Sequence, residues 1–148
     1  MSLEELYREV ILDHYRNPRN RTALAAPAAV AEGVNPLCGD EVTIELEFDG
    51  DVVSGVSVRG QGCSISQSSA SMMSEAIRGK TRAEIQELST RFKAMLSTED
   101  GDVELDPDRP GAVLGDLEAL QGVKNYPVRI KCASLPWATL QDALSSAN

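Results

Sequence analysis

The sequence has few of the residues on which several common functions depend. It contains one histidine and three cysteines among 148 residues, and 23 aspartate and glutamate residues outnumber its 14 lysine and arginine residues. The formal charge of −9 gives a surface that repels phosphate backbones, so we do not expect nucleic acid as a partner. A single histidine also gives little support to a Cys–His protease, which needs a nucleophile, a base and an oxyanion hole.

Long hydrophobic runs are absent as well. No stretch is long and apolar enough to cross a membrane, and the acidic N-terminal residues, Glu4 and Glu5, do not resemble a signal peptide. Three cysteines without an export signal favour reduced thiols that act as ligands or nucleophiles over a disulfide framework. We therefore expect a cytoplasmic protein with no membrane partner.

What is present is enough for one domain. The chain is 42% hydrophobic and 25% charged, a composition that allows a buried core without disulfide or metal staples. We expect a single domain over residues 1–148, with an acidic insertion at about 97–121.

Apolar residues at helical spacing predict five helices. Ser2 with Glu5, and Thr81 with Glu84, form capping boxes in front of the first and third of them. The predicted helices are one ending before Pro18, one from Ser64 to Ile77, one after Thr81, a short one around Leu117 that stops at Gly122, and one that begins near Ser134–Pro136.

A β-hairpin is predicted between the first two helices. Apolar and polar residues alternate over 42–48, Asp49 and Gly50 supply the turn, and Val56 and Val58 mark the returning strand. The preceding segment, Thr22 to Asn35, is rich in alanine and is interpreted as an irregular surface crossing.

The acidic loop 97–111 does not predict a calcium site. Its acidic residues are spaced like the start of a calcium-binding loop. However, Leu105 stands where such a loop needs glycine, and Gly111 stands where it needs a bidentate glutamate.

The three cysteines and one aspartate are the candidate site. Antiparallel pairing of the predicted hairpin brings Asp40, at its start, close to Cys63, just past its end. Cys132 is expected immediately before the last helix, where a helix N-terminus favours the thiolate that zinc binds. Together with Cys38, these residues supply three sulfurs and a carboxylate, which make one tetrahedral zinc set.

Each of these residues also has a simpler interpretation. A lone cysteine is often a small buried hydrophobic residue, and Asp40 after Gly39 could only cap a turn through the backbone. His14 lies on the apolar face of the first helix, which is typical of a half-buried, hydrogen-bonded histidine. We keep His14 as a reserve metal ligand in case Asp40 is not one.

At these residues the chain resembles the iron–sulfur assembly proteins of the IscU/SufU superfamily, and within it the SufU type. The similarity covers nearly the whole chain and includes three ordered cysteine motifs. Two features indicate the SufU type: Lys131 stands before the third cysteine where classical IscU scaffolds have histidine, and the stretch from Ser97 to Gln121 resembles the SufU insertion. The motifs are Cys38-Gly39-Asp40, Gly60-Gln61-Gly62-Cys63 and Arg129-Ile130-Lys131-Cys132.

The resemblance implies an α+β fold, with a small antiparallel sheet of about three strands packed by about five helices. It implies zinc bound by Cys38, Asp40, Cys63 and Cys132. It also implies a partner, a SufS-type cysteine desulfurase that carries pyridoxal phosphate and donates persulfide sulfur, and downstream Suf assembly proteins as further partners. Pro136 departs from the family pattern and affects where the last helix begins.

From this resemblance we expect Cys38 to be the nucleophile of a zinc-dependent sulfurtransferase, because it lies in a loop beside a glycine. Arg129 is expected beside the site, where it could pair with an acidic patch on the partner, although a solvated arginine remains an alternative. Two other functions stay open. One is a scaffold that assembles a transient [2Fe–2S] cluster on the same ligands, and the other is a structural zinc module for protein contacts.

Overall fold

A computed structural model describes residues 2–36, 39–96, 108–109 and 111–146. It combines a three-stranded antiparallel sheet with four α-helices and one 3₁₀ helix, which confirms the expected α+β class. Along the chain the elements are α1 (Leu3–Arg16), β1 (Ala29–Asn35), β2 (Asp40–Asp49), β3 (Val52–Gln61), α2 (Ser64–Ile77), α3 (Arg82–Leu96), η1 (Gly115–Asn125) and α4 (Pro127–Ser146).

The predicted N-terminal caps of α1 and α3 are present. Ser2 Oγ accepts a hydrogen bond from the backbone N–H of Glu5 at 3.2 Å. Before α3, Thr81 and Glu84 form both bonds of a capping box: Glu84 N–H donates to Thr81 Oγ1 at 3.2 Å, and Thr81 N–H donates to Glu84 Oε1 at 3.0 Å. These bonds satisfy backbone donors that have no partner within the helix, so both helices begin where the sequence indicates.

The hairpin is also as predicted. β2 and β3 pair antiparallel around Gly50, which has a φ of 64°, with a register irregularity between Glu47 and Phe48. Ile44 and Leu46 of β2 are fully buried and belong to one hydrophobic core, and Phe48 packs against that core partly buried.

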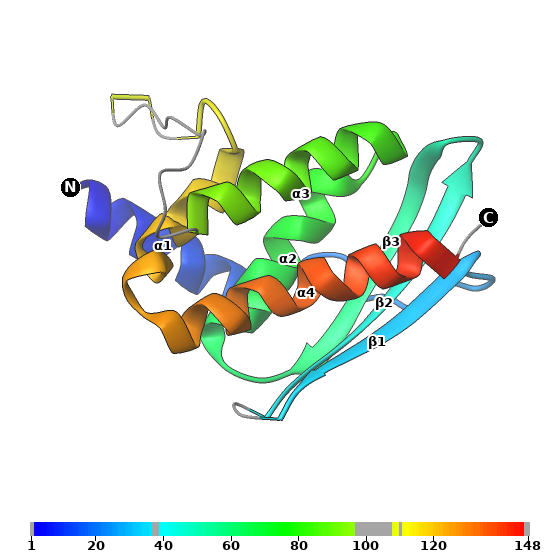
Figure 1. Cartoon of the computed structure of the whole chain (residues 1–148), viewed down its shortest axis with the longest axis horizontal. Coiled ribbons are helices and arrows are strands. Elements are labelled where there is room, and N and C mark those ends of the chain that lie inside the picture. Colours follow the sequence, from blue (N-terminus) through cyan, green and yellow to red (C-terminus); the bar gives the residue numbers. More distant parts are fainter. Residues whose placement is uncertain (1, 37–38, 97–107, 110, 147–148) are drawn as a thin grey trace.

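The position of β1 was not predicted from the residues, because its segment was interpreted as an irregular surface crossing, although the resemblance implied about three strands. Residues Ala29–Asn35 instead pair antiparallel with β2 in the sheet order β1-β2-β3. α4 packs against β1 and β2, as Figure 1 shows. A Cβ at Gly33 would collide with Thr139 Oγ1 of α4. Small residues in β1 therefore allow this helix to approach the sheet, and they also weaken the alternation that normally reveals a strand.

The C-terminal half corrects two further expectations. The short helix η1 does not stop at Gly122 but continues as a 3₁₀ helix to Asn125. The last helix begins at Pro127, not near Ser134, and Pro136 lies inside it. Pro127 occupies the first helical position, where a backbone N–H would have no partner within the helix, so its absence costs nothing. Pro136 lies in the interior and has no N–H to donate to the carbonyl of Cys132 one turn earlier.

Candidate metal centre

Three of the four expected ligands converge at one end of the sheet. The ligand atoms of Asp40, Cys63 and Cys132 all lie within 4.8 Å of one another. They come from the start of β2, the start of α2 and the interior of α4. In the described part of the chain no other group of three histidine, cysteine or acidic side chains is gathered in this way. Cys38 lies outside the described residues.

Asp40 is fully buried as the first residue of β2, where it pairs with Asn35 of β1. Its Oδ1 accepts a hydrogen bond from the backbone N–H of Cys63 at 2.9 Å, and its Oδ2 lies 4.0 Å from Cys63 Sγ. One carboxylate oxygen is thus held by the backbone, and the other faces a sulfur. A buried carboxylate needs such partners, because leaving it unpaired in the interior is costly.

Gly62 makes this arrangement possible. It has a φ of 150°, and a Cβ at this position would collide with Asp40 Oδ1 and would lie 2.9 Å from Ser66 Oγ. Only a residue without a side chain lets the backbone pass so close to the carboxylate. The glycine of the Gly-Gln-Gly-Cys motif therefore shapes the pocket of Asp40.

Cys63 is the N-cap residue of α2, and its side chain is half-buried. The backbone N–H of Ser66 donates to Cys63 Sγ at 3.5 Å, and Ser66 Oγ lies 3.8 Å from the same sulfur. Helix N-termini interact favourably with negative charge, so this is a suitable position for a thiolate. A helix N-terminus was expected beside Cys132, but only Cys63, directly before the helix predicted from Ser64, occupies one.

Cys132 lies inside α4 rather than before it, in the second turn after Pro127, and is fully buried. Its Sγ lies 3.8 Å from the carbonyl oxygen of Val128, one turn earlier. The predicted helix-dipole effect on Cys132 was therefore wrong in its location, because Pro136 was taken for the helix start. A sulfur in a helix interior is held firmly by the backbone around it.

These donors fit zinc. Zinc–sulfur bonds of about 2.3 Å in a tetrahedron place two sulfurs about 3.8 Å apart. Adjustments of about 1 Å or less would bring donors that lie within 4.8 Å to that spacing. Two thiolates and a carboxylate with restrained positions are a suitable partial set for zinc, and a fourth donor would complete it.

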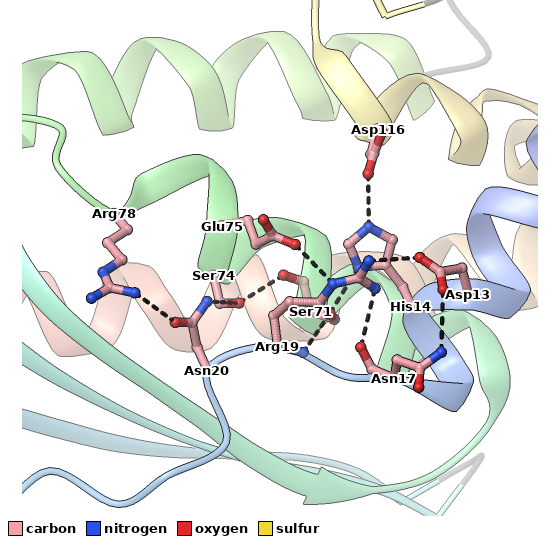
Figure 2. A network of polar contacts seen from close by, with 10 residues as sticks. All are labelled: Asp13, His14, Asn17, Arg19, Asn20, Ser71, Ser74, Glu75, Arg78 and Asp116. Atoms are coloured by element: carbon pink, nitrogen blue, oxygen red, sulfur yellow. Dashed lines mark hydrogen bonds and ion pairs between the residues drawn. The ribbon is translucent and has the colours of Figure 1, made fainter.

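His14 does not belong to this centre. The ring is buried, with Nδ1 2.8 Å from Ser71 Oγ and Nε2 2.9 Å from Asp116 Oδ2 (Figure 2). Ser71 Oγ accepts a hydrogen bond from the backbone N–H of Arg19, so its hydroxyl hydrogen can donate to Nδ1. This pattern assigns the tautomer with a hydrogen on Nε2. Both ring nitrogens are used, which confirms a hydrogen-bonded histidine, although the ring is fully buried rather than half-buried. His14 is not among the three residues whose ligand atoms converge.

The Asp116–His14–Ser71 arrangement contains the residue types of a catalytic triad but does not form a nucleophilic site. Ser71 is buried, and its Oγ is occupied by Arg19 and His14. Ser71 is therefore held as a buried hydrogen-bonding residue rather than as an accessible nucleophile. Sequence reasoning missed the contact, because nothing in the pattern relates positions 102 residues apart.

Arg129 and Lys131 are exposed on the first turns of α4, before Cys132. Arg129 is thus on the same helical segment as a candidate ligand. No helix in the described part of the chain is long and apolar enough to cross a membrane.

Residues 6–133 match the family described as NifU-like N terminal domain. The chain belongs to this family. Among solved structures, a protein titled putative iron–sulfur cluster assembly scaffold protein for SUF system (FiSufU), from Fervidobacterium islandicum AW-1, superposes with a TM-score of 0.81 at 39% identity, over 95% of this chain and 98% of that one. The N-terminal part of a NifU-like protein from Brucella abortus gives a TM-score of 0.82 at 25% identity, over 97% and 95% of the two chains.

Two relatives that cover nearly the whole chain have names that describe a function. The zinc-dependent sulfurtransferase SufU of Bacillus subtilis is 43% identical over 144 residues, which is 97% of this chain and 92% of the relative. The iron–sulfur cluster assembly scaffold protein IscU of Streptococcus pyogenes is 35% identical over 147 residues, or 99% and 87% of the two chains. The name of the first relative thus describes zinc-dependent sulfur transfer, and the name of the second describes iron–sulfur cluster assembly.

Proposed function

We propose that this chain is a cytoplasmic iron–sulfur cluster assembly protein of the SufU type. It would accept persulfide sulfur from a SufS-type, pyridoxal phosphate-dependent cysteine desulfurase and so increase the turnover of that enzyme. The observation that carries the proposal is the convergence of Asp40, Cys63 and Cys132 within 4.8 Å. The name of the B. subtilis relative, 43% identical over nearly the whole chain, supports the same chemistry.

Cys38, Asp40, Cys63 and Cys132 would hold the zinc. When bound, zinc supplies positive charge that keeps thiols deprotonated and limits their oxidation. Three thiolates and one carboxylate around a dication give a formal charge near −2, so the release of one thiolate is electrostatically favoured.

Cys38 is the proposed nucleophile because the other donors are restrained. Asp40 accepts the Cys63 N–H, Cys63 is held at the start of α2, and Cys132 is enclosed in α4. Cys38 is two residues from Asp40 in the sequence and next to Gly39, whose φ of 69° marks a turn.

The transfer is an exchange that needs no external oxidant. The Cys38 thiolate attacks the outer sulfur of the desulfurase persulfide, and a new sulfur–sulfur bond forms as the old one breaks. The desulfurase cysteine leaves as a thiolate, and Cys38 carries the persulfide. Arg129 would pair with an acidic patch on the desulfurase, and downstream Suf assembly proteins would then receive the sulfur.

The Cys38→Ser variant tests this mechanism. We expect a folded protein that no longer stimulates a SufS-type desulfurase and gains no sulfur by mass spectrometry, whereas the parent chain gains one sulfur on Cys38. Retained stimulation by Cys38→Ser would contradict the assignment. A circular dichroism spectrum like that of the parent controls for folding.

The alternative of a [2Fe–2S] scaffold is favoured by the names of the IscU relatives, the first of which is 35% identical over 147 residues. Lys131, where classical IscU scaffolds have histidine, argues against it. Elemental analysis with an ultraviolet–visible spectrum separates the two functions. One colourless zinc per chain supports sulfur transfer, whereas iron and sulfide in brown protein support the scaffold. Zinc without any effect on a desulfurase would favour the structural zinc module.

A further inference from the structure

An open groove lies between α1 and η1, beside the candidate metal centre. It consists of two adjoining hollows of about 690 and 500 Å³ that share residues of α1, η1 and the start of α2. Its apolar lining includes Ile11, Ile65, Ala119 and Val123. We refer to it as the α1–η1 groove. Clefts of this kind, with a largely apolar lining, are where proteins usually bind other molecules.

The groove leads to the sulfur ligands. Ser64, which directly follows Cys63, lines both hollows. Arg129, one turn before Cys132 on α4, lines the smaller one. A segment bound in the groove would therefore lie next to the residues that must meet the sulfur donor.

The charged residues that line the groove, which we call its rim, are mostly basic. They are Arg8, Lys124 and Arg129 with a single acid, Glu4, although the whole chain carries a net charge of −9. Within the described part of the chain, none of these three cations takes part in an ion pair. By contrast, Arg19 and Arg59, away from the groove, are paired with carboxylates.

The rim also has the composition of a protein-binding surface. Tyr126 lines both hollows and is 65% exposed, and Tyr7 lines the larger one. Tyrosine and arginine are enriched among the residues that contribute most to binding at protein interfaces. An exposed tyrosine beside unpaired cations is therefore better suited to a protein partner than to a small apolar ligand.

From these observations we propose that the α1–η1 groove binds an acidic segment of the protein that donates persulfide sulfur, with an apolar side chain of that segment seated on the groove floor. The proposal rests on the sulfur-transfer function described above and names the surface through which the donor would dock. Charge complementarity carries the choice of partner, since unpaired cations around an apolar floor attract acidic residues. The short path from the groove to Cys63 would align the docked donor with the metal centre.

The test compares two double charge reversals in the zinc-loaded protein. Arg8→Glu with Lys124→Glu changes the groove rim, and Arg78→Glu with Lys80→Glu is the matched control. The control residues lie at the turn between α2 and α3, on the side of the molecule away from the N-terminus (Figure 1). Tyr126→Ala and Tyr15→Ala form a second matched pair, since Tyr15 is 45% exposed and does not line the groove.

The readouts are the affinity for a SufS-type desulfurase and the stimulation of its turnover. We expect the rim reversal to weaken binding about 10- to 100-fold and the control reversal to change it less than about threefold. The concentration for half-maximal stimulation should rise by the same factor, with maximal stimulation and zinc content unchanged. The difference between the two reversals should shrink in high salt, because salt screens exposed charges.

Equal affinities of the rim and control variants would overturn the docking surface and leave the proposed function intact. A fall in maximal stimulation at an unchanged half-maximal concentration would overturn it too, since that would indicate an effect on the transfer step. Self-association of the parent that only the rim reversal abolishes, with desulfurase binding unchanged, would make a second copy the occupant. A parent chain that neither binds nor stimulates the desulfurase would overturn both proposals.

Discussion

His14 Nε2 lies 2.9 Å from Asp116 Oδ2, although the two residues are 102 positions apart in the sequence. The contact joins α1 to η1, and the other ring nitrogen joins α1 to Ser71 of α2. η1 leads directly into α4, which carries Cys132. One buried imidazole thus fixes the element that precedes a candidate metal ligand (Figure 2).

Replacing His14 should therefore destabilise the fold more than replacing its exposed partner. We expect His14→Ala to lower the free energy of unfolding by about 2–4 kcal/mol, because it removes a buried ring and leaves the Ser71 hydroxyl without its acceptor. Asp116 is 61% exposed, and Asp116→Asn keeps an acceptor oxygen, so its cost should stay below about 1 kcal/mol.

Urea unfolding followed by the emission of Trp137, the only tryptophan, measures both values. Equal costs for His14→Ala and Asp116→Asn would show that the buried ring does not hold η1 in place.

The carboxylate of Asp40 is predicted to depend on Gly62. In Gly62→Ala the added methyl group would collide with Asp40 Oδ1, so the carboxylate must move away from its place beside Cys63. Changes that misplace a metal ligand typically cost 10- to 100-fold in metal affinity, and we expect a loss of about that size. Competition with a zinc chelator measures it.

Gly79→Ala is the matched control. Gly79 also has a positive φ, of 83°, but nothing lies within 4 Å of a Cβ placed there. It should lose about 1 kcal/mol of stability and retain zinc affinity. Similar zinc losses in both alanine variants would mean that backbone strain, not the collision with Asp40, is responsible.

Two substitutions of Asp40 should separate its structural role from its role as a ligand. Asp40→Asn keeps an oxygen that can accept the Cys63 N–H, so the free energy of unfolding of the metal-free protein should fall by less than about 1 kcal/mol. Asp40→Ala leaves that N–H without its acceptor and should lower the same free energy by about 1–3 kcal/mol.

Both Asp40 variants lack the charged ligand and should gain less thermal stability from added zinc than the parent, because stabilisation by a ligand grows with its affinity. Thermal unfolding with and without zinc checks this. A full zinc response in Asp40→Asn would remove Asp40 from the ligand set.

The capping box before α3 predicts a pH effect. The hydrogen bonds from the backbone and side chain of Thr81 hold the pKa of Glu84 below its ordinary value of 4.5. A carboxyl with a lowered pKa in the folded state stabilises the protein above pH 4.5, and this contribution is lost as the pH falls below 4.5. Glu84→Gln should therefore be less stable than the parent at neutral pH, with the difference shrinking in acid. Urea unfolding from pH 7 to pH 3 measures it, and a difference that grows in acid would contradict the assigned sign.

Much of the fold follows from local signals. Ser2 and Thr81 cap their helices, and Gly50 makes the hairpin turn, because each satisfies a backbone requirement that short-range sequence can express. The meeting of Asp40 and Cys63 followed from that hairpin.

The errors arose where distant packing overrides local pattern. Position 33 has no room for a side chain, because α4 packs directly against β1 there. The strand therefore lacks the clear alternation of apolar and polar residues that would have revealed it. Pro136 resembles a helix start, but the tertiary structure holds it in a helix interior, where Ser69 Oγ donates to the carbonyl of Ala133 at 2.6 Å. The partnership of His14 with Asp116 has no local signal at all.

The placement of Cys132 in the last helix sets an order of events during synthesis. Ribosomes make chains from the N-terminus, so a nascent chain that has not reached α4 possesses Asp40 and Cys63 but lacks the sulfur that closes the set. Docking of α4 on β1 and β2 is what brings that sulfur to the other two donors. A chain in which α4 has not docked would therefore offer the metal one sulfur fewer than the folded domain does.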